Sequence, residues 1–443
     1  MTIPLVERAE HHTSRLAISA VDGEHTYGDL LASSARVASG LLGESDDLNG
    51  DRVAFLVPPD SRYTAVQWGI WRAGGLAVPL CLSHPEPELE YVISDCQARI
   101  LVASPEMMQR LEPIARRLGL RLDSTDDLQR SEVIDLPAVG AERPAMIIYT
   151  SGTTGGPKGV VTTHGNIRAQ IESLVEAWEW QPEDRILLTL PLHHVHGVIN
   201  GLGCAMWSGA VCEMMPRFEA EKVWQRLVES PLTLFMAVPT IYAKLAAAWE
   251  SGDPGVQEQW SMACRRLRLM VSGSAALPVV LFDRWREISG HDLLERYGMT
   301  EIGMALSNPL NGPRVPGHVG RPLPGVEVRR VASDGLPLAL GSEPGEIEVR
   351  GAGVFAEYWQ RPRETQDAFR EGGFRTGDVA VVEDGSFRIL GRQSVDIIKT
   401  GGYKVSALEV EESLRQHTAI AECAVVGTVD DEWGERVAAA VIP

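Results

Sequence analysis

The chain has 443 residues, of which 44% are hydrophobic and 23% charged, and its formal net charge is -19 at pH 7. This composition is typical of a globular protein with a large buried core and excludes a fibrous or disordered chain. The negative charge argues against nucleic-acid binding, which needs a basic surface, so any anion site must be locally basic. The opening MTIPLVERAEHH lacks the apolar segment of a signal peptide, and no apolar run of about 18 residues follows, so we expect a cytoplasmic protein without a membrane partner.

Apolar β-branched runs alternate with amphipathic segments along most of the chain. In the first part, the pattern predicts strands at 52–60, 75–80 and 98–104 and helices at 26–42, 62–75 and 88–96. In the second part, it predicts strands at 145–150, 184–192, 210–215, 232–240, 266–273 and 292–298, with helices such as 166–178 and 278–290 between them. Repeated strand-helix-strand units imply an α/β fold with two parallel sheets covered by helices.

The pattern of apolar and glycine residues changes after residue 320. Short apolar runs bounded by glycine turns at 325–335, 345–351 and 377–390 predict a small antiparallel or barrel-like element. From Gly391 onward the pattern indicates a separate α+β unit, so we expect two domains, 1–390 and 391–443. The six cysteines form no CxxC pair, which argues against a zinc site or a disulfide framework.

The segment YTSGTTGGPKGVVTTHGNI, residues 149–167, crowds glycines, hydroxyl side chains and one lysine between an apolar strand and a helix. Glycines let the backbone come close to a ligand, and the hydroxyls together with Lys158 would surround phosphate oxygens. It is not a Walker loop, because Pro157 and Gly159 stand where that motif needs a glycine and a hydroxyl residue. The residues predict polyphosphate binding, with a flexible surface loop as the alternative.

This segment resembles the phosphate loop of the adenylate-forming superfamily, which includes acyl-CoA synthetases, peptide-synthetase adenylation domains and firefly luciferase. Five further segments are similar in the same order: PLHHVHG (191–197), VSGSAALP (271–278), ERYGMTE (295–301), RTGDVA (375–380) and GRQSVDIIKTGGYKV (391–405). Within the superfamily, LLERYGMTE and NPLNGPRVPGHVGRPLPGV most resemble the malonyl-CoA synthetases. The resemblance implies a large N-terminal domain that binds ATP and the acyl group, and a small C-terminal lid.

The family continues beyond this lid through a Gly-Lys segment that carries an adenylation lysine, whereas this chain stops at AAAVIP. We therefore expect the C-terminal domain to be truncated. The family hinge is expected within 393–396, but RQSVDIIK is one residue longer than the common spacing, so no pivot residue is assigned.

The resemblance implies a two-step reaction that uses ATP, Mg²⁺ and coenzyme A. A carboxylate attacks the α-phosphorus to give an acyl-adenylate and pyrophosphate, and the thiol of coenzyme A then displaces AMP. Tyr297 is expected to stack on adenine, Asp378 to bind the ribose and Arg392 to make a second ribose or phosphate contact. The implied catalytic residues are Lys158, Thr150, His194 and Glu301, and Glu301 with Thr150 would hold the metal. The residues implied to bind nucleotide or coenzyme A are Thr150, Ser151, Gly152, Thr153, Thr154, Gly273, Ser274, Ala275, Arg296, Tyr297, Gly298, Met299, Thr300, Asp378, Arg392, Gly402, Tyr403 and Lys404.

Substrate choice is expected to depend on Arg296, which resembles a specificity position that is commonly small in relatives. A buried arginine is costly unless the substrate brings a matching anion, which favours a small dicarboxylate such as malonate, or methylmalonate if the pocket leaves room for a methyl group. The alternative is a surface pair of Arg296 with Glu295. The implied substrate-binding residues are Arg296, His194, Val195, His196, Ser272, Met304 and Arg314.

Two other functions stay open at this point. The chain could be a CoA ligase for a different acid or a stand-alone adenylation domain that loads a carrier protein, and an assay for the coenzyme A thioester separates these. It could also be a ligand-binding relative without full turnover.

Overall fold

The computed structural model describes residues 3–150, 156–332, 334–339, 341, 343–417, 419–430 and 433–443. The chain folds into two compact units, each assembled from separate stretches of sequence. The first unit comprises Met1–Met236, Met299–Gly303 and Ala352–Gln366, and the second comprises Ala237–Gly298, Met304–Gly351 and Asp367–Pro443. The expected domain boundary between residues 390 and 391 is a different division and stays a prediction.

The first unit contains a seven-stranded sheet that carries the predicted phosphate loop. Its order is β18 (Glu357–Tyr358), β8 (Lys158–Thr163), β7 (Pro144–Thr150), β4 (Leu76–Pro79), β3 (Arg52–Leu56), β5 (Ile100–Ala103) and β6 (Arg121–Ser124). The pairings from β7 to β6 are parallel, whereas β8 is antiparallel to both β7 and β18. The central strands are continuous apolar runs because both faces of a parallel sheet are buried, as Leu56, Val78 and Leu101 show.

Five more strands of the first unit follow one another in a second sheet. Their order is β2 (Gly23–Thr26), β1 (Leu16–Ala20), β10 (Val211–Met214), β9 (Arg185–Leu188) and β11 (Leu234–Ala237). Only β2 runs antiparallel to its neighbour. This arrangement confirms the expected α/β class with mostly parallel sheets.

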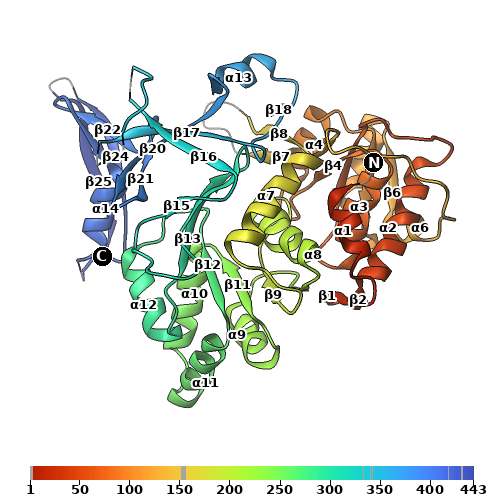
Figure 1. Ribbon diagram of the computed structural model, residues 1–443, viewed down its shortest axis with the longest axis horizontal. Coiled ribbons are helices and arrows are strands. Elements are labelled where there is room, and N and C mark those ends of the chain that lie inside the picture. The colour runs from red at the N-terminus through yellow and green to blue at the C-terminus, as the bar shows by residue number, and fades with distance from the viewer. Residues whose placement is uncertain are drawn as a thin grey trace. The chain divides into compact units, whose positions relative to one another are not determined.

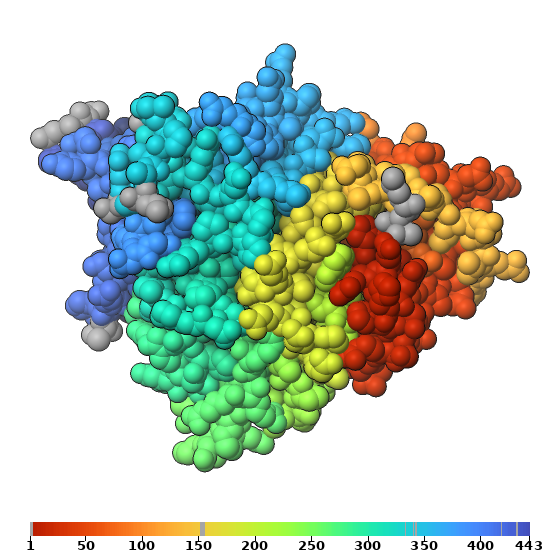
Figure 2. Space-filling view, viewed as in Figure 1, coloured from red at the N-terminus to blue at the C-terminus, as the bar shows by residue number. Residues whose placement is uncertain are grey.

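Helices cover the sheets of the first unit (Figure 1). The helices of the first unit are α1 (Pro4–Glu10), α2 (Tyr27–Leu42), α3 (Ser61–Arg72), α4 (Glu86–Asp95), α5 (Met108–Leu118), α6 (Thr125–Gln129), α7 (His164–Ala177), α8 (Cys204–Ser208) and α9 (Ala220–Glu229), with a 3₁₀ helix at Pro105–Met107 and a π-helix at His196–Gly203; the short α13 (Pro362–Asp367) follows β18. A reciprocal cap between Thr26 and Asp29 satisfies the first backbone amides of α2. Figure 2 shows α1 (red) against the yellow surface of α7, with which it packs.

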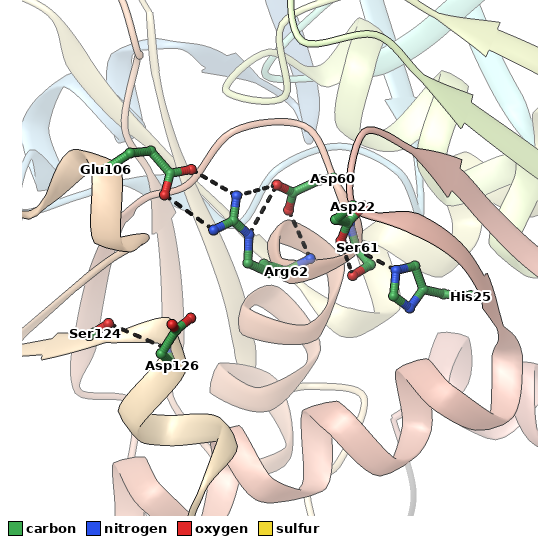
Figure 3. Close-up of polar contacts among 8 residues, drawn as sticks. All are labelled: Asp22, His25, Asp60, Ser61, Arg62, Glu106, Ser124 and Asp126. Atoms are coloured by element: carbon green, nitrogen blue, oxygen red, sulfur yellow. Dashed lines mark hydrogen bonds and ion pairs between the residues drawn. The ribbon is translucent and has the colours of Figure 1, made fainter.

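The start of α3 is fixed by a buried carboxylate (Figure 3). Asp60 is fully buried and accepts a hydrogen bond of 2.9 Å from the backbone amide of Arg62, whose guanidinium bridges Asp60 and Glu106. Burial raises the pKa of Asp60, and the hydrogen bond from Arg62 opposes that shift. Ser61 donates to Asp22 at 2.5 Å, so the turn between β1 and β2 is tied to the same helix end.

The second unit holds the remaining sheets. Four of its strands follow one another in the order β12 (Leu269–Ser272), β13 (Leu294–Met299), β14 (Gly303–Ser307) and β15 (Arg321–Pro322). A second sheet of this unit has the order β16 (Val326–Val331), β17 (Gly345–Gly351), β20 (Gly373–Glu383) and β19 (Phe369–Arg370), with β21 (Ser386–Arg392) beside β20. That second sheet is antiparallel throughout, which confirms the small antiparallel element expected after residue 320. The helices here are α10 (Pro239–Glu250), α11 (Pro254–Arg265) and α12 (Val279–Ser289).

The end of the chain forms a small α+β layer, as expected. Its sheet has the order β23 (Tyr403–Ser406), β22 (Ile397–Thr400), β25 (Gly434–Ile442) and β24 (Glu422–Asp430). Helix α14 (Ala407–Arg415) packs on this sheet through a small apolar cluster that includes Ile398, Ala407 and Val425. None of the described helices in either unit combines the length and apolarity that a membrane crossing requires.

Candidate active site

The predicted phosphate loop joins two antiparallel strands. Thr150 at the end of β7 is paired in register with Lys158 at the start of β8. The segment 149–167 lies between the apolar strand β7 and the helix α7, as expected, and it also contains β8, which the sequence pattern did not predict; α7 begins at His164. Ser151, Gly152, Thr153 and Thr154 lie outside the described residues. Of the predicted loop residues, Thr150 and Lys158 lie side by side as the last pair of the β7–β8 hairpin before its loop.

Lys158 has two partners from the stretch 352–366. Its ammonium forms an ion pair with the carboxylate of Glu364 and lies 5.2 Å from the centre of the Tyr358 ring. The side chain is 24% exposed, so the charge is shielded from water on most sides. An ammonium over an aromatic face is attracted by the ring quadrupole, which holds the lysine in one direction.

Glu301, the predicted magnesium ligand, is buried beside the same tyrosine. It is 6% exposed, and the hydroxyl of Tyr358 donates to its Oε1 at 2.8 Å. The backbone amide of Phe355 donates to the carbonyl of Glu301 at 2.7 Å. We name Lys158, Glu301, Tyr358 and Glu364 the lysine–carboxylate cluster. Over the described parts of the chain, no three His, Cys, Asp or Glu side chains gather into a metal cage.

Three residues predicted to bind the nucleoside are connected to one another in the second unit. The Tyr297 hydroxyl donates to Asp378 Oδ2 at 2.5 Å, and Arg392 Nε donates to Asp378 Oδ1 at 3.2 Å. Asp378 and Arg392 are register partners on β20 and β21, and the amide of Asp378 is bonded to Thr376 Oγ1. Burial and the negative charge of Asp378 raise the pKa of Tyr297, so its hydroxyl stays protonated and keeps donating.

Arg296 is a buried cation. It is 3% exposed, and its Nη2 donates to the hydroxyl of Ser274 at 3.2 Å. Its Nε has no hydrogen-bond partner among the described residues, and burial lowers the pKa of the guanidinium to about 9. Gly273 makes room for it, because a Cβ on that glycine would stand 2.6 Å from Arg296 Cζ.

The alternative of a surface pair between Arg296 and Glu295 is wrong. Glu295 is 5% exposed, and its Oε1 accepts from the amide of Gly317 at 3.0 Å. Burial raises the pKa of Glu295 to about 8, against the opposing hydrogen bond from Gly317, and the charge of Glu412 adds to the rise. Successive strand residues point to opposite faces, which separates the two side chains. Ser272 is the register partner of Glu295 on β12 and therefore lies on the Glu295 face.

The other predicted substrate residues occupy different surroundings. His194 stacks against His193 with ring centres 4.1 Å apart, and desolvation lowers the pKa of His194 to about 4, so its imidazole is neutral at pH 7. Val195 and His196 are buried at the start of the π-helix, an uncommon helix form that often marks functional sites. Met304 is buried on β14 in the second unit.

Arg314, the second candidate cation, is held by its own loop. Its guanidinium donates to the carbonyls of Pro309, Asp292 and Leu310. Burial lowers the pKa of Arg314. Its role in substrate binding stays a prediction.

The remaining predicted nucleotide and coenzyme A residues lie at strand ends and turns. Gly298 and Met299 end β13, Thr300 precedes Glu301, and Ser274 and Ala275 follow β12, with Ser274 at φ 69°. Gly402 lies in the turn of the β22–β23 hairpin, and Tyr403, which is 76% exposed, and Lys404 begin β23. Their roles stay predictions.

Sequence reasoning missed Tyr358, Glu364, Thr376 and His193. Tyr358 stands 57 positions from Glu301, and no local spacing links them. Thr376 was visible in RTGDVA, where a hydroxyl two residues before an aspartate is a common turn cap.

Comparison with models of known families identifies the family of this chain. The model of the AMP-binding enzyme family matches residues 5–359, and that of the AMP-binding enzyme C-terminal domain matches residues 409–443. The chain belongs to the AMP-binding enzyme family. This confirms the resemblance drawn from the six sequence segments.

Several members of the family are similar over nearly the whole chain. The mitochondrial malonate–CoA ligase of Xenopus laevis is 48% identical, with 99% of this chain and 83% of the relative covered. The human protein of that name is 46% identical with the same coverage, and the malonate–CoA ligase of Arabidopsis thaliana is 40% identical over 98% of this chain and 77% of the relative.

Solved structures of the family share the fold. The structure of ATP-bound MatB from Rhodopseudomonas palustris superimposes with a TM-score of 0.90 at 33% identity, covering 100% of this chain and 88% of that one. A malonyl-CoA ligase in ternary product complex with methylmalonyl-CoA and AMP gives a TM-score of 0.79 at 35% identity, covering 100% of this chain and 92% of that one.

Proposed function

We propose that this AMP-binding enzyme ligates malonate to coenzyme A, with a malonyl-adenylate as the intermediate and AMP and pyrophosphate as products. The malonate–CoA ligases of frog, human and Arabidopsis, which match almost the entire chain, support this function. The CoA ligase names of these relatives and the ATP-bound MatB structure support an acid–thiol ligase that uses ATP and coenzyme A.

The observation that carries the choice of acid is the buried guanidinium of Arg296. Its Nε lacks a partner among the described residues, and its Nη2 contacts a neutral hydroxyl. A cation at 3% exposure is costly unless an anion accompanies it. A diacid supplies one carboxylate for activation and keeps the other for Arg296. A monoacid leaves the guanidinium unmatched.

Taken separately, each unit carries residues that suit one chemical part of MgATP. We assign the polyphosphate to Lys158, Thr150 and Glu301, and the nucleoside to Tyr297 and Asp378. Fixed hydroxyl, carboxylate and guanidinium groups on rigid strands position the α-phosphorus for attack, and positioning is the main contribution where the enzyme forms no covalent intermediate. Arg392 holds Asp378, the carboxylate assigned to the ribose, in place through a hydrogen bond of 3.2 Å from its Nε.

The residues present fit magnesium that arrives with ATP. Mg²⁺ prefers oxygen ligands and is commonly held by one or two carboxylates together with substrate phosphates. Glu301 supplies one buried carboxylate, and its neighbour Thr300 and the hairpin residue Thr150 supply hydroxyl oxygens. When bound, the ion would neutralise negative charge on the phosphates.

The reaction then proceeds in two balanced steps. A malonate oxygen forms a bond to the α-phosphorus while the bond to the β-phosphate oxygen breaks and pyrophosphate leaves. The sulfur of coenzyme A next bonds to the acyl carbon, the acyl–oxygen bond to AMP breaks so that AMP leaves with that oxygen, and the thiol proton passes to solvent. Gly402, Tyr403 and Lys404 are assigned to the pantetheine arm.

An acid panel tests this function. The purified chain is supplied with MgATP, coenzyme A and one of malonate, methylmalonate, acetate or butyrate, and AMP and thioester are measured separately. We expect malonate to be the best substrate and both monoacids to be poor, because a site built around a charged group rejects analogues that leave it unpaired. Equal rates with butyrate and malonate would contradict the assignment to a diacid. AMP formation that needs a carrier protein in place of coenzyme A would indicate a loading domain.

Two finer points belong to the same proposal. Methylmalonate turnover would show that the acyl site leaves space for a methyl group. A cytoplasmic location stays a prediction, since the frog and human relatives carry names that place those proteins in mitochondria.

A further inference from the structure

The stretch 355–364 crosses the start of β8 in the first unit. Figure 1 shows β18 beside β8. Tyr358 pairs in register with Val160, and the amide of Trp359 donates to the carbonyl of Gly159 at 2.8 Å. The amide of Tyr358 also donates to Thr365 Oγ1 at 3.0 Å. The backbone of this tyrosine is therefore fixed by strand pairing on one side and by the start of α13 on the other.

The Tyr358 side chain touches two residues of the lysine–carboxylate cluster at once. Its hydroxyl donates to Glu301 at 2.8 Å, and its ring lies 5.2 Å from the ammonium of Lys158. The ring itself is set edge-on to Phe355, with ring centres 4.7 Å apart. At 8% exposure the tyrosine has little freedom to turn.

We propose that Tyr358 is a positioning residue for the metal and phosphate groups of MgATP, and this inference rests on the proposed function. The hydroxyl holds one oxygen of the Glu301 carboxylate and so limits rotation of the side chain that would hold the metal. The ring keeps Lys158 beside the hairpin mouth. One side chain thereby couples the carboxylate and the cation, which lie far apart in sequence.

The physical basis is that outer partners orient the groups that bind a metal directly. Removing such a partner typically lowers metal affinity by about 10- to 100-fold. We expect a measurable effect because loss of this hydrogen bond loosens the orientation of the Glu301 carboxylate, and Mg²⁺ demands near-ideal geometry from its ligands. Lys158 should be less affected by loss of the hydroxyl alone, because the ring remains.

The test replaces Tyr358 with phenylalanine, which keeps the ring, its packing on Phe355 and the contact with Lys158. Mn²⁺ serves as a probe for the metal, and its affinity for the enzyme–ATP complex is read from water-proton relaxation. We expect Tyr358→Phe to weaken Mn²⁺ binding by about 10- to 100-fold, with ATP affinity in EDTA and the KM for malonate unchanged.

Tyr27→Phe is the matched control. Tyr27 also donates from a buried hydroxyl in the first unit, to the backbone carbonyls of Ala210 at 2.7 Å and Ala205 at 3.0 Å, and it belongs neither to the lysine–carboxylate cluster nor to the predicted phosphate loop. This control should leave Mn²⁺ affinity at the wild-type value. Glu301→Gln should lose Mn²⁺ affinity like Tyr358→Phe or more strongly.

Each outcome decides one question. Unchanged Mn²⁺ affinity in Tyr358→Phe would overturn the positioning role. Unfolding of that variant, or an equal loss of metal-free ATP affinity, would also overturn it, because the hydroxyl would then serve the structure in general. A wild-type protein that makes no malonyl-CoA and binds no Mn²⁺ with ATP would instead contradict the proposed function, before any variant is compared.

Discussion

Arg296 offers the most direct test of substrate choice at the scale of one residue. Removing one partner of a buried ion pair costs roughly 3 to 5 kcal/mol, so Arg296→Ala should lower kcat/KM for malonate by about two to four decades. Affinity for MgATP should stay near the wild-type value, and calorimetry with ATP measures this directly.

Arg330 provides a matched control for this prediction. It is likewise 3% exposed in the second unit, but its guanidinium donates to the backbone carbonyls of Glu343 and Ala339. Arg330→Ala should lower stability without a selective effect on malonate. A malonate defect of equal size in both variants would mean that loss of any buried arginine, and not loss of an anion site, explains the result.

Gly273 tests the same pocket without removing the charge. A Cβ at this position would approach the Arg296 guanidinium to 2.6 Å, a distance that side chains do not tolerate without movement. Gly273→Ala should therefore displace the cation and lower kcat/KM for malonate on the order of 10²-fold, since a misplacement of about 1 Å can have that effect. Steady-state kinetics with malonate varied at saturating MgATP measure the effect. Normal malonate kinetics would show that Arg296 does not need this position.

At the scale of one element, the β22–β23 hairpin depends on its two glycines. Gly401 and Gly402 have φ of 55° and 83°, and two positive values are what a two-residue hairpin turn requires. A Cβ on Gly401 would also stand 2.7 Å from the Trp433 ring, whereas Gly402 has open space around it. Alanine at either position should cost about 1 to 2 kcal/mol of backbone strain, with the larger loss at Gly401 because of the added clash.

Urea unfolding measures this difference. Gly255→Ala is the control, because Gly255 lies in α11 with open space around it and alanine is the better helix former. It should raise stability slightly while both hairpin variants lower it. An equal effect of alanine at Gly401 and Gly402 would remove the tryptophan contact from the explanation.

Helices and strands could be predicted from the sequence where burial alone determines the pattern of apolar residues. Strands such as β3 and β4 are continuous apolar runs, because both faces of a parallel sheet exclude water. β8 was missed because its last residue, Thr163, is also the capping residue of α7, so the strand runs into the helix without a separating turn. The π-helix at His196–Gly203 was missed too, since its hydrogen bonds leave no periodic apolar signal.

The candidate site could be predicted from the sequence only in part, for a related reason. Motif residues such as Tyr297 and Asp378 were predicted one by one, and the structure joins them through a hydrogen bond across 81 positions. The bond between Tyr358 and Glu301 depends on strand pairing between distant stretches. Sequence spacing carries no information on such a contact, because only the folded sheet creates it.

For the whole molecule, the raised pKa of Glu295 predicts how the free energy of unfolding varies with pH. Its pKa is about 8 in the folded chain, against an ordinary value of 4.5. The folded state therefore binds the proton more tightly than the unfolded state, so the contribution to stability is fully present below about pH 4.5 and is lost as pH rises through 8.

Glu295→Gln isolates this contribution, because the amide is similar in shape and carries no charge. The stability of the wild type relative to the variant should fall by up to a few kcal/mol between pH 5 and pH 9, as about 1.4 kcal/mol corresponds to each unit of pKa difference. Urea unfolding at a series of pH values gives the curve. A constant difference across this range would show that Glu295 titrates normally.

The discontinuous first unit has a consequence for how the chain folds during its synthesis. Residues 1–236 emerge from the ribosome long before Ala352–Gln366, which supplies β18. Until that stretch arrives, the edge of β8 is unpaired and Glu301 lacks its tyrosine, and unpaired sheet edges favour association with other chains. At about 5 to 20 residues per second, the wait lasts many seconds. Nascent chains stalled before residue 352 should therefore bind holding chaperones more strongly than chains released past residue 366.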